Sequence, residues 1–125
     1  MGCSSINYPA VNDSPNGGAA VYRNISLLAT GQVVKAAAGR VYGWKMFNNN
    51  AAKLYVKIYD KATAAGTGDT PKLTVEIAPG ASDTFEIPAG LRFDTGIGVR
   101  ACTGVADNDN TAPSANDVIV NLFYA

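Results

Sequence analysis

Histidine is absent from all 125 residues of the chain. It is the usual general base, the usual partner of a nucleophilic serine or cysteine, and the commonest metal ligand in proteins. A chain without it lacks the parts from which most hydrolytic and metal-dependent sites are built. We therefore expect a protein that is not an enzyme and needs no cofactor.

Net charge, long apolar runs and cysteine are also scarce. Ten basic and ten acidic residues cancel, so nothing indicates DNA, RNA or an anionic membrane as a partner. No apolar run approaches the roughly 18 residues of a spanning helix, and no signal-peptide pattern is present. Cys3 and Cys102 are the only cysteines and do not indicate a disulfide, so we expect folding in a reducing compartment.

Helical periodicity is missing too, and short runs of β-branched and aromatic residues alternate with clusters of Gly, Pro, Asn and Asp. This pattern predicts an all-β fold, an antiparallel β-sandwich in a single domain over residues 21–125. The last strand is apolar on both faces, which is typical of a central strand or one covered by a neighbouring subunit. The expected strands are 23–28, 32–37, 40–47, 53–60, 72–77, 83–87, 91–93, 96–102 and 117–124.

Residues 1–20 look different from the rest, being rich in Pro, Gly, Asn and Asp. We expect them to form an irregular, extended N-terminal arm. Its sparse apolar residues, together with the first aromatic residue after it, are predicted to contact a partner. They are Ile6, Tyr8, Val11 and Tyr22.

The stretch KLYVKIYD at residues 53–60 alternates strictly. Leu54 and its alternate neighbours would face the core, and Tyr55, Lys57 and Tyr59 would then face outward. Tyr55 and Tyr59 are therefore further predicted partner contacts. With Tyr42 and Trp44, these rings between basic residues could also stack on a sugar, although a solvated sheet face has the same pattern.

The triplet Asp94-Thr95-Gly96 matches the way an aspartic protease presents its catalytic carboxylate. Such a site pairs two carboxylates and needs a small residue after the triplet, but Ile97 stands there and little chain follows. The alternative is a tight turn, capped by the Asp94 side chain, with Gly96 at positive φ. We favour the turn.

The loop segment DNDN at residues 107–110 offers carboxylate oxygens from Asp107 and Asp109. Calcium binds such oxygens, but the spacing and the terminal Glu of a calcium loop are missing. These two residues are weak metal candidates, and a solvated loop is the preferred interpretation.

Several stretches of residues 39–125 recur in a known group of proteins. They are YVKIYDKAT with its Gly and Thr loop, IPAGLRF followed by TGIGVRACTG, the Asn-rich loop from ADNDNT, and a closing strand that ends in Tyr and a small residue. In these features the chain resembles small virion proteins of tailed bacteriophages, of the capsid decoration or cement type.

The resemblance implies a jelly-roll-like sandwich, made in the host cytoplasm and located on the capsid surface of the virion. It would be a homo-oligomer, dimer or trimer, whose partner is the major capsid protein and which stabilises joints between capsid subunits. A second hypothesis is a tail or fibre module that binds a host glycan or another tail protein. A dimeric aspartic protease using Asp94 is the third.

Overall fold

The computed structural model describes residues 18–125, which form eight strands and no helix. The predicted Ile6, Tyr8 and Val11 therefore lie outside the described residues. Among those described, no helix is long and apolar enough to cross a membrane. The strands are β1 Ala20–Asn24, β2 Gln32–Lys35, β3 Gly39–Asn48, β4 Leu54–Tyr59, β5 Leu73–Ile77, β6 Ser82–Phe93, β7 Ile97–Cys102 and β8 Val118–Tyr124.

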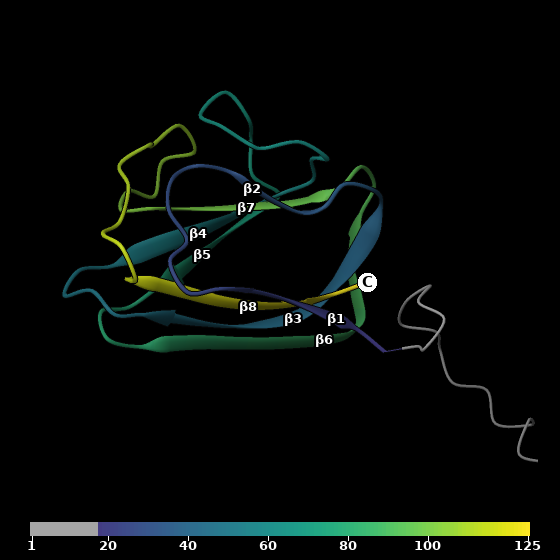
Figure 1. The fold of residues 1–125 in the computed structure, drawn as a ribbon, viewed down its shortest axis with the longest axis horizontal. Coiled ribbons are helices and arrows are strands. Elements are labelled where there is room, and N and C mark those ends of the chain that lie inside the picture. The colour runs from purple at the N-terminus through teal and green to yellow at the C-terminus, as the bar shows by residue number, and fades with distance from the viewer. Residues whose placement is uncertain (1–17) are drawn as a thin grey trace, which may run out of the picture.

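The strands form two four-stranded antiparallel sheets, and Figure 1 shows them stacked as two layers. The first sheet has the order β1-β8-β3-β6 and the second β2-β7-β4-β5. First strand pairs with last, second with seventh, third with sixth and fourth with fifth, as if one long hairpin had been rolled up. The predicted antiparallel sandwich is confirmed, and β8 is a central strand of the first sheet.

Two boundaries differ from expectation. The first strand was expected at 23–28, and β1 spans Ala20–Asn24. The two strands expected at 83–87 and 91–93 are one strand, β6, with residues 87–90 standing opposite Tyr42 alone. Gly90 makes this bulge possible, because it has φ +81° and an added Cβ would lie 2.9 Å from the Tyr42 ring.

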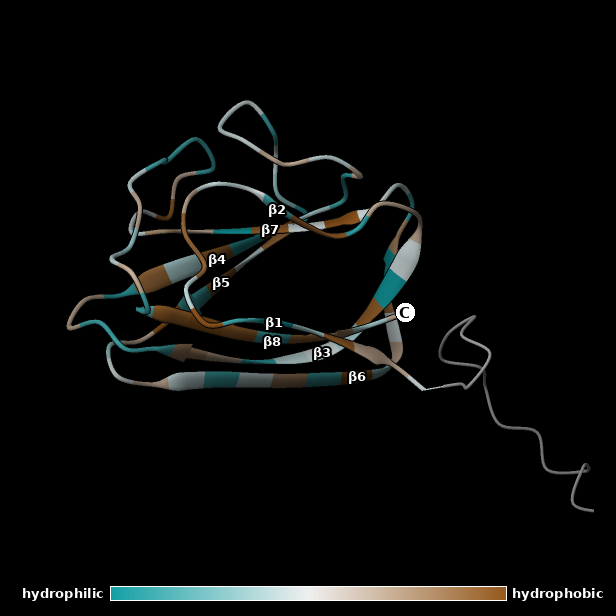
Figure 2. Ribbon diagram, in the orientation of Figure 1, coloured by the Kyte–Doolittle hydropathy of each residue, from teal (hydrophilic) through white to brown (hydrophobic). Residues whose placement is uncertain are grey.

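The core lies between the two sheets and follows from the alternation of apolar residues (Figure 2). In β8, Val118, Val120 and Leu122 are fully buried, and in β4 Leu54, Val56 and Ile58 meet them from the other layer. Each such side chain stabilises the fold by about 1.5–3 kcal/mol relative to exposure. Burial of these inward faces fixes the strand register and leaves one outer face on each sheet.

Candidate functional site

The outer face of the second sheet is covered by the chain itself. Lys57, Arg100 and Cys102 have no exposed area, and Tyr59 is 1% exposed, although all four point away from the core between the sheets. The loop of residues 103–117 lies over them, and Figure 1 shows it above β4 and β7 with the loop of residues 60–72 beside it. Lys57 and Tyr59 thus face away from the core as predicted, but the expectation that this face presents them to a partner is wrong, because the loop covers them.

Arg100 is the centre of this covered face. Its Nε donates to the Tyr59 hydroxyl at 2.7 Å, and one terminal nitrogen donates to the backbone carbonyl of Asp107 at 3.1 Å. The other terminal nitrogen lies 3.1 Å from the Cys102 sulfur and 3.3 Å from the Asn110 side-chain oxygen. The neighbouring cation, Lys57, donates to the carbonyl of Ala106. Two buried cations thus hold the loop through neutral acceptors.

The thiol and the phenol in this cluster are kept protonated. Burial raises the pKa of the Tyr59 phenol, against the opposing effect of the Arg100 hydrogen bond and charge. Burial likewise raises the pKa of the Cys102 thiol, although Arg100 and Lys57 oppose that shift. A neutral, covered thiol is a poor nucleophile, so this geometry serves to anchor the loop.

The triplet Asp94-Thr95-Gly96 is the turn that carries the chain from β6 in one sheet to β7 in the other. The predicted turn is confirmed, but its cap is Asp60. The Asp60 carboxylate accepts the backbone N–H of all three turn residues, at 3.0, 2.8 and 3.2 Å. Partial desolvation would raise the pKa of Asp60, but the three donors outweigh it and lower that pKa.

Asp94 and Gly96 have other roles in this turn than those predicted. The Asp94 carboxylate is exposed and forms an ion pair with Arg92 at 2.8 Å. Gly96 is not among the glycines with positive φ. It is required because an added Cβ would lie 2.6 Å from the Ala62 backbone. Asp94 thus sits in an open turn with a cation beside it.

The Asp109 carboxylate forms hydrogen bonds within its own loop. It accepts the backbone N–H of Gly104 at 3.0 Å, and both the N–H and the hydroxyl of Thr111 at 3.2 Å. Desolvation raises the pKa of Asp109, but these donors outweigh it and lower the pKa. Asp107 contributes its carbonyl to Arg100. Within residues 18–125 no three acidic, Cys or His residues gather as a metal site would require.

The aromatic residues named for sugar stacking do not share a surface. The Trp44 ring is 6% exposed, stacks on Phe85 with centroids 4.8 Å apart, and donates its indole N–H to Asp83 at 2.8 Å. Tyr59 is buried in the other sheet. Tyr55 is half-buried in β4 of that same sheet, and Tyr42 lies in β3 of the first sheet. Tyr22, a predicted partner contact, is half-buried and packs against the core. The aromatic residues that alternate with basic residues in the sequence therefore lie in different parts of the sandwich.

The outer face of the first sheet, in contrast, is open; we call it the open face. Figure 1 shows the two long loops on the far side of the molecule from it. Its side chains form three rows across the strands, given by the strand register. The rows are Val21, Phe123, Gly43 and Glu86; then Arg23, Asn121, Lys45 and Thr84; and then Ile119, Phe47 and Ser82.

The rows differ in chemistry. The first and third hold apolar side chains, with Val21 56% and Phe47 38% exposed. The middle row is polar and basic, and Arg40 adds a further exposed cation at one end of β3. None of the three ion pairs found within residues 18–125 involves Arg23, Arg40 or Lys45. The open face therefore presents apolar ridges on either side of a basic strip.

From the sequence, β8 is apolar on both faces, as a central strand or a strand covered by a neighbouring subunit would be, but no residue of this face was predicted as a partner contact. The apolar outward residues Ile119 and Phe123 broke the alternation expected of a solvated strand. The chain has no counterpart in the comparisons: no family model, curated protein or solved structure matches it.

Proposed function

We propose that the protein is a non-enzymatic virion structural protein that binds the assembled capsid shell of a bacteriophage and stabilises joints between major capsid subunits. One observation carries the proposal: within residues 18–125 nothing covers the open face, which mixes apolar ridges with cations that form no ion pair there, while the opposite face is closed by its own loop. The resemblance of residues 39–125 to phage decoration proteins supports the choice of partner.

The open face indicates the chemistry of the complementary surface. Arg23, Arg40 and Lys45 favour an acidic surface, and Phe47 and Val21 favour shallow apolar patches beside it. Because exposed charges are screened by salt, binding of this kind weakens as ionic strength rises. The partner is thus an acidic, partly apolar region on the outside of the shell.

Decoration of this kind needs no chemistry. A protein that binds only the assembled shell lowers the free energy of that state, and each bound copy adds its own contribution.

The proposal is tested first by copy number in purified source particles, measured by quantitative mass spectrometry against the major shell protein. Decoration predicts a ratio within a few-fold of one. A ratio of a few per hundred would place the protein in a tail or fibre, and absence from the particle would end the proposal.

The second test uses charge reversal with a matched control. Lys45→Glu on the open face should weaken co-sedimentation with stripped shells about ten-fold or more, a loss of about 1.4 kcal/mol. Lys53→Glu makes the same change at an exposed residue outside the open face, beside Glu76, and should bind like the unaltered protein. Equal binding by both variants would remove the open face from the interface.

A further inference from the structure

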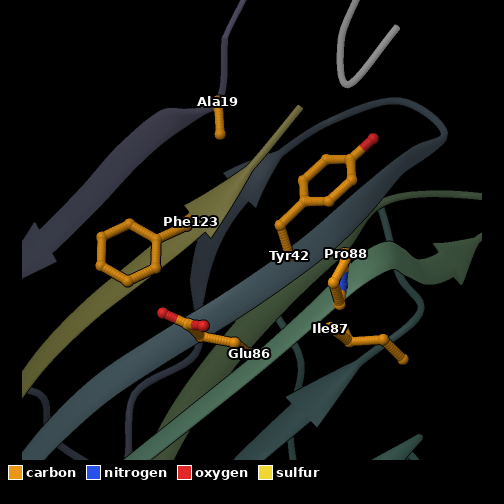
Figure 3. A pocket seen from close by; sticks show the side chains of 6 residues that line it. All are labelled: Ala19, Tyr42, Glu86, Ile87, Pro88 and Phe123. Carbon is orange, nitrogen blue, oxygen red and sulfur yellow. The ribbon is translucent and has the colours of Figure 1, made fainter. Parts of the chain in front are cut away.

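One end of the open face is hollowed into a groove of about 410 Å³. Strands β3, β6 and β8 and the residue before β1 border it, and Figure 3 shows the Tyr42 and Phe123 rings on neighbouring strands with Glu86 beside them. The lining is mostly apolar, with one carboxylate. The lining residues are Ala19, Tyr42, Glu86, Ile87, Pro88 and Phe123.

Ala19 places the root of the N-terminal arm in the wall of this groove. The described part of the chain begins at Gly18, one residue before this wall, and 17 residues precede it in the sequence. They contain the apolar residues Ile6, Tyr8 and Val11, and Asp13 is their only charged side chain. Residues 12–18, NDSPNGG, are turn formers, which suits a chain that reverses its direction.

We propose that this groove is the binding site for residues 6–11 of the same chain. The connecting segment is short, so the local concentration of these residues at the groove is high, on the order of millimolar. The apolar side chains of Ile6, Tyr8 and Val11 can pack against the rings and the proline of the lining. The Glu86 carboxylate can accept a hydrogen bond from the Tyr8 hydroxyl. A second copy of the chain would have to compete with this tethered segment.

This inference is independent of the capsid proposal, since it concerns the free protein. The lining of the groove includes Phe123 and Glu86 of the first row and no residue of the rows of Lys45 and Phe47. An arm bound there would complete the apolar surface at one end of the open face.

The test uses a cysteine already present in the arm. A nitroxide is attached to Cys3 of the full-length protein, since Cys102 is buried and protected from the reagent, and backbone amide signals are recorded by NMR. The amide signals of Tyr42, Ile87 and Phe123 should be broadened at least two-fold relative to the reduced label. Signals from residues 103–110, on the covered side, should not change. Groove signals that are unaffected by the label would overturn the proposal.

Two variants and a mixed sample make the result specific. Replacing Ile6, Tyr8 and Val11 together by Ser should abolish the broadening, and Ile87→Ser should reduce it from the groove side. Val105→Ser, at a 62% exposed loop residue, should leave it unchanged. In a mixture of nitroxide-labelled, isotope-free protein with unlabelled, isotope-enriched protein, broadening of the groove signals would show exchange between copies and contradict binding within one chain.

Discussion

The outer faces of the two sheets have similar side chains, but one face is covered by a loop and the other is exposed. Both present cations and aromatic residues away from the core, but Arg100 and Lys57 are fully buried while Arg23 and Lys45 are exposed. The difference is the loop of residues 103–117, whose carbonyl groups and Asn110 side chain accept hydrogen bonds from the cations of the second sheet. A face that the chain closes by itself contributes stability, and a face left open is available to a partner.

This contrast predicts that the covered face carries most of the sensitivity to substitution. Arg100→Ala should lower the free energy of unfolding by about 3 kcal/mol, because it leaves Tyr59 and the loop carbonyls without partners and opens a cavity. The measurement is urea denaturation followed by tryptophan fluorescence.

Lys57→Met is the matched control for Arg100→Ala. It replaces the second buried cation with an apolar side chain of similar length, so it should be neutral or stabilising. An equally large decrease in the free energy of unfolding in both variants would mean that the fold requires both cations.

Alkaline pH should loosen the covered face before the open one. The pKa values of Tyr59 and Cys102 are raised in the folded protein. The stability that these two groups contribute is therefore complete below their unfolded values, about 8.5 for Cys and 10 for Tyr, and is lost as pH rises through the folded values. The melting temperature should thus fall above about pH 8.5. This decrease should be smaller than the one that Arg100→Ala causes.

The serine in Cys102→Ser can still form hydrogen bonds but does not titrate in this pH range. In this variant the part of the decrease in melting temperature that begins near pH 8.5 should therefore disappear. An unchanged profile would show that Cys102 is not the group that titrates.

The turn between the sheets provides a smaller test. Asp60→Asn weakens three hydrogen bonds and should lower the free energy of unfolding by about 1 kcal/mol, a modest figure because the site is exposed. Asp94→Asn removes only an exposed ion pair and should cost less than about 0.5 kcal/mol.

Acid should reproduce the effect of Asp60→Asn. The folded pKa of Asp60 is lowered, so its contribution is present above the unfolded value of about 3.9 and is lost as pH falls through the folded value. The Asn variant should therefore show a shallower loss of stability below about pH 4. The opposite ranking of Asp60 and Asp94 would restore Asp94 as the residue that holds the turn.

The smallest effects on stability are expected on the open face. Lys45→Glu should change the free energy of unfolding by less than about 0.5 kcal/mol because its side chain is exposed, and Phe47→Ser, at a residue 38% exposed, should lower it by about 1 kcal/mol at most. The check is the same urea denaturation. A loss above about 1.5 kcal/mol in either variant would mean that the open face is part of the folded core.

Alternation of apolar residues was enough to predict the sandwich, because inward residues such as Val56 and Val120 repeat with period two. It could not predict the covered face. Alternation describes one strand at a time, and whether Lys57 meets water depends on a loop that folds back about 50 residues later. The Asp60 cap was missed for the same reason, since its turn lies more than 30 residues away in sequence.

Other features left a local signal that was misread. Pro88-Ala89-Gly90 looked like a break between strands, but it is a bulge within β6. The run IGVRAC is apolar or small apart from Arg100, and every residue of it is buried. An arginine inside such a run indicates a cation with internal partners.

Oxidative footprinting of side chains tests the central claim most directly. The protein is exposed to hydroxyl radicals free in solution and bound to source particles, and modification is measured residue by residue. The account predicts that Phe47 and Ile119 become protected on the particle, while Tyr55 and Val105 react equally in both states. Protection of Tyr55 and Val105 with no change at Phe47 would show that the partner binds the covered side.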